Sequence, residues 1–238
     1  MKDSSENKLS VQSDDELIEK MVAEALESLE IPFKYKDKGF DDFNIARLMN
    51  KDADLIIAEL EKYAKNYINN RRTPNWLVLQ GPCGSGKTHL AIAILKESLS
   101  QDITYQMKKS PNKHDKKFVA QSKDFIFAPS SELFQDLKDS YDCDDINERD
   151  VLKKYKNCSM LVIDDLGTVQ TSKWYKDKLY QILNYRSGEM LPTIITTNLS
   201  SEELLEQIDQ RIFDRIIESA DNGKNLWKLI AYSYRRSA

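Results

Sequence analysis

The sequence predicts an α/β fold in which a parallel β-sheet lies between helices. The first indication is the glycine-rich segment GPCGSGKT at 81–88, which lies between an apolar run and a helix-like one. The second is a pair of short runs, SMLVIDDLG at 159–167 and LPTIITTN at 191–198, that are typical of buried parallel strands. Helical patterns alternate with these runs, which favours a sheet whose ligand lies at the carboxyl ends of the strands.

Three units are predicted along the 238 residues. Residues 1–12 are polar and are expected to form a disordered tail. Residues 13–70 are expected to form a helical amino-terminal extension, and residues 71–238 a core that contains the glycine-rich segment. The boundary falls at RRTPN, residues 71–75, where a proline and polar residues break the preceding helical pattern.

The extension begins with an amphipathic helix. Ser13 and Glu16 have the spacing of a capping box, and the helix ends at Pro32. The apolar residues of one helical face are Leu17, Ile18, Met21, Val22, Ala25, Leu26 and Leu29. This face either packs on the core or binds a partner protein, and both alternatives stay open. An irregular segment follows, and a second helix is expected over about 52–69.

The core is expected to alternate strands with helices. In chain order, the predicted strands are 76–79, 103–107, 124–130, 159–167, 191–198 and 226–232. The predicted helices are 89–99, 131–141, 174–186 and 201–218.

The composition indicates a soluble globular protein, with 40% hydrophobic and 31% charged residues. No apolar run approaches the roughly 18 residues of a membrane span, and the polar start lacks a secretory signal, so we expect no membrane association and a cytoplasmic location. A net charge of -4 gives no field that would attract nucleic acid to the whole surface. The three cysteines and two histidines are unpatterned, which argues against a disulfide framework or a zinc site.

The glycine-rich segment is predicted to bind ATP. Its pattern, G-x-x-x-x-G-K-T, directs backbone N–H groups at closely spaced phosphate oxygens, at the positive end of the following helix. Lys87 adds a cation at the β- and γ-phosphates, and the Thr88 hydroxyl contacts Mg²⁺. The expected ATP contacts are Gly81, Pro82, Cys83, Gly84, Ser85, Gly86, Lys87, Thr88 and His89. The flanking strand and helix argue against a glycine turn without a ligand.

Hydrolysis also requires a carboxylate that holds Mg²⁺ and a group that positions water. Asp164 ends a buried strand and is expected to hold the metal, while the adjacent Asp165 polarises the water. Asn198 ends another strand and is a candidate to contact the γ-phosphate or the water. The alternatives are structural: the two acids end a strand before a turn at Gly167, and Asn198 caps the next helix.

Two arginines lie on the last predicted helix. Arg211 and Arg215 are four residues apart, so both point to one side of that helix. Without further context, the alternative is surface pairing with Asp214 or Glu218.

The ordered set GPCGSGKTHLA, LVIDDLG, PTIITTN and QRIFDRI resembles the AAA+ ATPases of the DnaC/DnaI helicase-loader and IstB-like group. The resemblance covers about residues 31–236 and includes IPFKYKDKGFDDF before the core. It implies an AAA+ P-loop core with slow ATPase activity that depends on self-association through the ATP site. By this resemblance, Asn198 matches the first sensor of AAA+ proteins. Arg215 matches the arginine finger that reaches a neighbouring subunit, and Arg211 lies one helical turn earlier in the same QRIFDRI motif.

The sequence departs from the wider AAA+ pattern at two points. Many AAA+ proteins have glutamate where Asp165 stands, and the shorter side chain leaves room for a protein in which ATP binding matters more than hydrolysis. The residues after the arginine helix must supply the last strand, so no full carboxyl-terminal helical lid is expected. Arg235 and Arg236 are therefore not assigned as a second sensor.

The leading interpretation is a DNA replication protein that loads the replicative helicase onto single-stranded DNA. The alternatives are an IstB-like transposition helper that acts on duplex DNA, and a nucleotide-dependent scaffold with incidental hydrolysis. The amino-terminal helix is the candidate element for binding the helicase.

Candidate DNA contacts lie in a basic insertion and, as the resemblance implies, in the segment near 130–141 that follows the predicted strand. The lysines of the insertion are Lys108, Lys109, Lys113, Lys116 and Lys117. The alternative is a solvated tip with no ligand. Phe134 and Tyr141 follow the strand and are candidates for stacking on bases, with Phe134 the better candidate for the core.

Overall fold

The computed structural model describes residues 14–70, 75–109, 124–142, 147–168 and 172–231. Within these ranges, five strands form one parallel sheet in the order β2-β3-β4-β1-β5. The strands are β1 (Leu77–Gln80), β2 (Phe125–Pro129), β3 (Met160–Asp164), β4 (Thr193–Thr197) and β5 (Leu226–Lys228). The parallel α/β sheet and its last strand are therefore confirmed.

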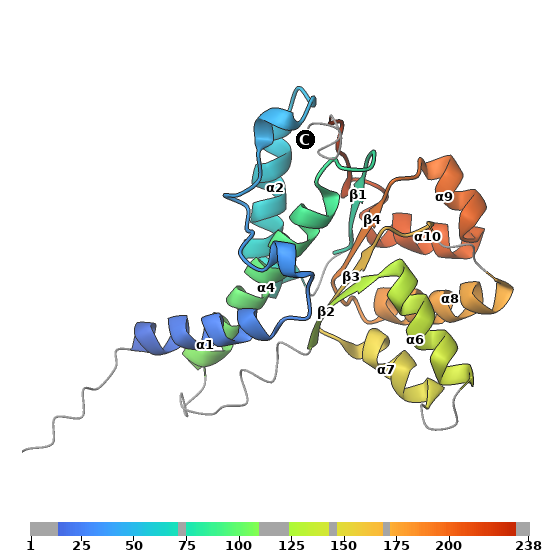
Figure 1. The fold of residues 1–238 in the computed structure, drawn as a ribbon, viewed down its shortest axis with the longest axis horizontal. Coiled ribbons are helices and arrows are strands. Elements are labelled where there is room, and N and C mark those ends of the chain that lie inside the picture. The colour runs from blue at the N-terminus through green and yellow to red at the C-terminus, as the bar shows by residue number, and fades with distance from the viewer. Residues whose placement is uncertain (1–13, 71–74, 110–123, 143–146, 169–171, 232–238) are drawn as a thin grey trace, which may run out of the picture.

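Helices cover both faces of the sheet (Figure 1). One layer contains α1 (Asp14–Ser28), α2 (Ala53–Lys65), α3 (Tyr67–Asn70) and α4 (Lys87–Lys109). The other contains α6 (Ser130–Asp142), α7 (Glu148–Asn157), α8 (Lys173–Gly188), α9 (Ser201–Gln207) and α10 (Gln210–Ser219). Two short 3-10 helices, η1 (Phe33–Tyr35) and η2 (Ile45–Arg47), lie in the segment between α1 and α2.

The strands are apolar on both sides because each face of the sheet is covered by helices. In β1, Leu77 and Leu79 join the hydrophobic cluster of the α4 layer, whereas Val78 and the preceding Trp76 join the cluster of the α8 layer. All four side chains are at most 1% exposed. This two-sided burial explains why β1 and β3 read as continuous apolar runs rather than as alternating patterns.

The strand predicted at 103–107 is wrong, because these residues belong to α4. Leu99, Ile103 and Met107 lie four residues apart and are all fully buried, so they continue the apolar face of one long helix. The β-branched and aromatic residues of ITYQM suggested a strand, but packing of this face outweighs their local preference.

Two further differences concern helices of the second layer. Helix α7 was not predicted, although Asn147 caps its first turn by accepting a hydrogen bond from Arg149 N. The single helix predicted at 201–218 is two helices, because Asp209 interrupts it and accepts from Arg211 N as the cap of α10. The two candidate arginines therefore lie at the start and middle of a separate helix.

The amino-terminal helix packs on the rest of the chain. Met21, Ala25 and Leu29 are buried in the same cluster as residues of α4, and the Lys36 ammonium donates to the carbonyls of Glu27 and Leu29 at the end of α1. This contact supports the docked alternative for the apolar face. Ser13 and the expected tail at 1–12 lie outside the described residues.

In the part of the chain that the structure describes, no helix combines the length and the apolar character needed to cross a bilayer.

Candidate functional site

The glycine-rich loop connects β1 to α4 at the carboxyl end of the sheet. Gly84 and Gly86 have φ angles of 80° and 93°, in the region that favours glycine. Lys87 is 4% exposed, and its ammonium donates to the carbonyls of Gly81 at 2.9 Å and Pro82 at 3.0 Å. The loop is thus folded back on the first turn of α4, and the Lys87 ammonium lies inside the curve of the loop.

Two glycines of the loop are also required by its neighbours. A Cβ at Gly81 would lie 2.3 Å from the Leu229 carbonyl oxygen, just after β5, and a Cβ at Gly86 would lie 2.5 Å from the Phe43 ring. Sequence reasoning attributed these glycines to phosphate binding alone. The structure adds a second cause, which is close packing against the chain's last strand and its amino-terminal extension.

The Asp164 carboxylate joins the loop to the sheet. The Thr88 hydroxyl donates to it, with Oγ1 3.0 and 3.1 Å from the two carboxylate oxygens, and the Thr196 hydroxyl donates to Oδ1 at 2.6 Å. Asp164 is 7% exposed. Burial raises the pKa of Asp164 above its ordinary value, and the hydrogen bonds from Thr196 and Thr88 partly oppose that shift.

Asp165 has an unusual backbone conformation. Its φ of 54° lies in the left-handed region, which is uncommon for residues other than glycine. Its N–H donates to Thr196 Oγ1 at 2.9 Å, and Leu166 N donates to the Thr196 carbonyl at 2.8 Å. These bonds turn the chain directly after β3 and place the second carboxylate beside the first.

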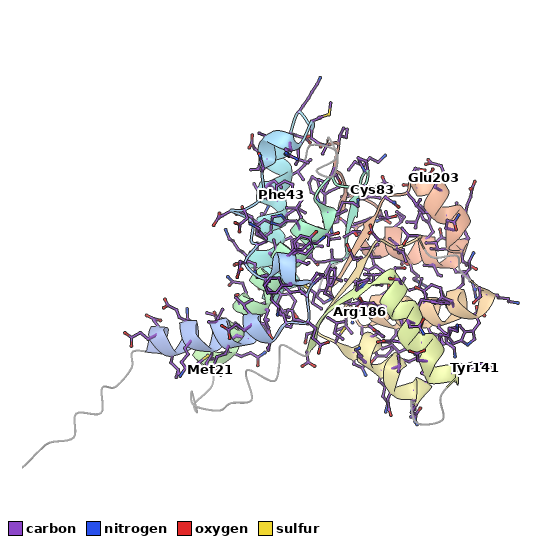
Figure 2. The ribbon with its side chains drawn as sticks, viewed as in Figure 1. Met21, Phe43, Cys83, Tyr141, Arg186 and Glu203 are labelled. Carbon is purple, nitrogen blue, oxygen red and sulfur yellow. The ribbon has the colours of Figure 1, made fainter. Side chains whose placement is uncertain are left out.

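Asn198 follows β4 and reaches the glycine-rich loop. Its Nδ2 donates to Cys83 Sγ at 3.3 Å, whereas its buried Oδ1 has no hydrogen-bond partner among the described residues. Figure 2 places Cys83 in the upper half of the molecule with Phe43, well above Arg186. The contact with Cys83 brings Asn198 to the glycine-rich loop, and its role as a sensor stays a prediction.

His89 contacts the extension. Its Nε2 lies 2.7 Å from the Gly39 carbonyl oxygen, and its ring packs edge-on against Phe43 and lies near Tyr35. The Lys96 ammonium, two turns further along α4, donates to the carbonyls of Lys36 and Lys38. These contacts fix the irregular segment against the first half of α4, so His89 has a structural role beside its predicted place in the ATP site.

Both candidate arginines make ion pairs with neighbouring helical residues. Arg211 pairs with Asp209 and with Asp177 on α8, and its guanidinium lies over the Tyr180 ring. Arg215 pairs with Glu218 at 2.6 Å. Their side chains are 54% and 38% exposed, so the structure does not bring them into the cluster around Asp164. The Glu218 pair is the surface alternative anticipated for Arg215.

The predicted DNA contacts lie away from the loop. Lys108 and Lys109 are exposed at the carboxyl end of the 23-residue α4, and a rise of 1.5 Å per residue puts this end roughly 33 Å from Lys87. Lys113, Lys116 and Lys117 lie outside the described residues. Tyr141 is 72% exposed and packs against the Trp174 ring, whereas Phe134 packs on the core against Tyr175.

The oxygen atoms at Asp164 suit a hard cation. The Thr88 hydroxyl and the Asp164 carboxylate are ligands of the kind that Mg²⁺ prefers, usually together with water and phosphate oxygens. Among the described residues, no group of three or more His, Cys, Asp and Glu side chains forms a metal site without such additional ligands. A metal that binds together with phosphate fits these residues.

Thr196 was not identified from the sequence. Its hydroxyl contacts both the Asp164 carboxylate and the backbone N–H of Asp165. The available signal was the pair of threonines at the end of an otherwise apolar strand, directly before Asn198.

Known proteins share this fold and this chain's sequence pattern. The replicative helicase loader DnaC of Escherichia coli strain K12 is 25% identical over 181 residues, which span 76% of this chain and 63% of the loader. The crystal structure of a DnaC helicase loader superposes with a TM-score of 0.61 at 24% identity, over 84% of this chain and 100% of that one. The DnaI structure gives 0.57 at 22% identity, over 90% and 98%. No protein-family model matches the chain.

The parallel five-stranded sheet, with a glycine-rich loop after β1, has the AAA+ fold of these solved structures. Both its sequence relatives and its structural neighbours make the chain similar to the helicase loader DnaC, and its fold is also similar to that of DnaI.

Proposed function

We propose that this protein binds and hydrolyses ATP and loads a replicative helicase onto single-stranded DNA. The observation that carries the ATP site is the contact between Thr88 of the loop and Asp164 of β3. This contact brings together the two residues that P-loop proteins use to hold Mg²⁺. The replication role is supported by the likeness to the E. coli loader, which extends over 63% of that protein's length.

Each residue of the site has a distinct task in this proposal. The loop N–H groups and the Lys87 ammonium bind the phosphates, which requires Lys87 to exchange its contacts with Gly81 and Pro82 for phosphate oxygens. Thr88 and Asp164 hold Mg²⁺, which neutralises negative charge on the phosphates. Asp165 orients the attacking water, and Asn198 contacts the γ-phosphate or that water.

Hydrolysis is proposed to require a second copy of the chain. Arg215 is partly exposed on α10 and pairs with Glu218 on the same helix. A surface pair of this kind is weak, so it can be exchanged for a phosphate in a neighbouring subunit at little cost. Such an arginine neutralises charge on the transferred phosphoryl group.

The test is fluorescence anisotropy with a labelled oligothymidine and a labelled duplex of equal length, with and without Mg²⁺ and ATP, at two salt concentrations. The proposal predicts salt-sensitive binding that favours the single strand and requires ATP. Lys87→Ala should lose the ATP dependence, whereas Lys224→Ala, which removes an exposed lysine paired with Asp221, should keep it.

Preference for the duplex in this anisotropy experiment would favour a transposition helper over a helicase loader.

The protein partner is tested separately, by co-purification with a replicative helicase, repeated after removal of residues 1–30. Helicase loading that survives Asp165→Asn while ATP turnover stops would instead support the nucleotide-dependent scaffold.

A further inference from the structure

We propose that Thr196 is a positioning residue of this ATP site, and that its hydroxyl sets the geometry of Asp164 and Asp165 for Mg²⁺ and water. This inference rests on the proposed function, because it concerns the same site. It adds a residue on β4 (Thr193–Thr197) to a predicted set that had no member on that strand.

The Thr196 hydroxyl makes two hydrogen bonds, one as a donor and one as an acceptor. It donates to Asp164 Oδ1 at 2.6 Å and accepts from the N–H of Asp165 at 2.9 Å. A hydroxyl has one hydrogen to donate, so the bond to Asp164 fixes its direction. The oxygen that orients the first carboxylate therefore also holds the peptide of the second.

The position of this hydroxyl is itself tightly determined. Thr196 is fully buried, lies opposite Leu79 of β1 in the sheet register, and has a β-branched side chain with restricted rotation. Its carbonyl accepts from Leu166 N at 2.8 Å. Thr196 thus contacts three consecutive residues at the carboxyl end of β3. Because Thr196 is itself held in the sheet, these contacts restrain the positions of those residues.

The backbone of Asp165 explains why such a contact is needed. A residue other than glycine at φ 54° is disfavoured unless its surroundings hold it there. The Thr196 hydroxyl holds the N–H of that residue, so loss of the hydroxyl frees the peptide to relax. Of the two hydroxyl groups that donate to the Asp164 carboxylate, Thr88 would then remain, with its hydroxyl 3.0 and 3.1 Å from the two carboxylate oxygens.

The same strand provides a matched comparison at its other end. Thr193 is also fully buried, and its hydroxyl accepts from Arg186 Nε at 2.9 Å and donates to the Leu191 carbonyl at 3.1 Å. Both threonines therefore have a buried hydroxyl with one donor and one acceptor as partners. Only Thr196 contacts the candidate metal-binding carboxylate.

The experiment measures the affinity of a fluorescent, non-hydrolysable ATP analogue for the full chain, with Mg²⁺ and with EDTA. The variants are Thr196→Val, Thr196→Ala, Thr196→Ser and Thr193→Val, each checked by circular dichroism. Thr196→Val and Thr196→Ala should bind as the wild type does in EDTA but lose about tenfold or more of the gain that Mg²⁺ gives, as is typical when a residue that orients a metal ligand is removed.

Thr196→Ser keeps a hydroxyl and should retain most of the gain, and Thr193→Val should retain all of it even if its melting temperature falls. In Thr196→Val a methyl group replaces the hydroxyl and points at Asp164, whereas Thr196→Ala has no such methyl. Thr196→Ala therefore provides the test if the valine variant does not fold. The inference is overturned if the folded Thr196 variants keep the full Mg²⁺ gain, or if Thr193→Val loses as much.

The wild type separates this inference from the proposal on which it rests. Absence of nucleotide binding by the wild type in both conditions would reject the ATP site and the role of Thr196 with it. Wild-type binding without any gain from Mg²⁺ would reject the metal site and, again, the positioning role. If Mg²⁺ raises the nucleotide affinity of the wild type, Thr196→Val and Thr196→Ala by the same factor, the role of Thr196 is rejected while the proposed ATP site stands.

Discussion

Burial makes a negative charge on the Asp164 carboxylate costly. The carboxylate is 7% exposed, its pKa is raised by burial, and two hydroxyl groups are its hydrogen-bond donors. Active sites commonly hold such groups at the expense of stability, because the charge is needed by the ligand rather than by the fold. At the scale of single residues, we therefore expect the carboxylate that the proposed ligand needs to lower the stability of the fold.

Asp164→Asn is expected to stabilise the protein in the absence of Mg²⁺ and nucleotide. The amide removes the buried charge while keeping groups that can bond to Thr88 and Thr196, and the gain should be about 0.5–2 kcal/mol, as for comparable changes at functional sites. Chemical denaturation in EDTA measures it. Asp214→Asn, at an exposed carboxylate bonded to Gln210, should change stability little. A clear loss of stability in Asp164→Asn would contradict this account of the site.

Gly81→Ala is expected to destabilise the protein even without a ligand. The added Cβ would lie 2.3 Å from the Leu229 carbonyl, and overpacking of this kind typically costs about 1–3 kcal/mol. Gly188→Ala is the control, because a Cβ at the end of α8 meets no atom within 4 Å. In urea denaturation, the free energies of unfolding of the two variants should change in different directions or by clearly different amounts. Equal stability of Gly81→Ala and the wild type would show that the close approach is not real.

At the scale of helices and strands, the amino-terminal extension is packed on the core layer. Met21, Ala25 and Leu29 share a buried cluster with α4, and the segment around Phe43 contacts the glycine-rich loop at Gly86. The extension therefore contributes to the packing of the core and contacts the loop of the proposed ATP site. Its boundary with the core at residue 70 stays a prediction.

Leu29→Ala tests the packing of the extension. Leu29 is 2% exposed, and removal of a buried leucine side chain typically costs about 2–5 kcal/mol. The control is Leu55→Ala on α2, where the side chain is 57% exposed and the cost should stay within about 0.5 kcal/mol. The measurement is thermal and urea unfolding of both variants. A Leu29→Ala variant as stable as Leu55→Ala would contradict the packing of the extension on the core at this residue.

The sheet was predictable from the sequence because its strands are short, apolar and bounded by polar residues. LVIDD and TIITTN show both the strand and the residues placed at its carboxyl end, since parallel strands present those ends at one edge. The strand at 103–107 was wrong because a local preference for β-structure competes there with helical spacing of Leu99, Ile103 and Met107. Only the neighbours of α4 decide that competition.

The candidate site was predictable where residues meet through fixed loop geometry, as with Thr88 and Asp164. It was not predictable where the contact depends on the register between strands. Thr196 reaches Asp164 and Asp165 because β3 and β4 are paired in one particular register, which no local pattern specifies. The packing of Leu229 and Phe43 against the loop depends on residues far away in the sequence in the same way.

At the scale of the whole molecule, the polar and charged groups of the proposed reaction lie in two separate places. Lys87, Asp164 and Asn198 lie at the carboxyl end of the sheet, whereas Arg211 and Arg215 lie on α10 and pair with residues of α8 and α10. In the proposed function, a single chain would therefore present the binding half of an ATPase site and, elsewhere, the arginines that a second chain would use. The account predicts that turnover depends on assembly.

Arg215→Ala should leave ATP binding unchanged and lower hydrolysis by the roughly 10³-fold or more that an arginine finger contributes. The matched control is Glu218→Ala, which breaks the same ion pair but keeps the arginine, and its turnover should match that of the wild type. Steady-state hydrolysis across a range of protein concentrations measures both variants. Turnover per chain that is independent of wild-type concentration, or equal loss in both variants, would refute catalysis by a second copy.

Every step of this account depends on whether the loop at 81–88 binds ATP. Isothermal titration calorimetry with Mg²⁺ and ATP tests this most directly, on the wild type, Lys87→Ala and the surface control Lys224→Ala. The account predicts one ATP per chain for the wild type and the control, and binding weakened about tenfold or more in Lys87→Ala, because that ammonium is the cation closest to the loop carbonyls. A wild-type chain that binds no ATP, or a folded Lys87→Ala variant that binds it equally well, would contradict the central claim.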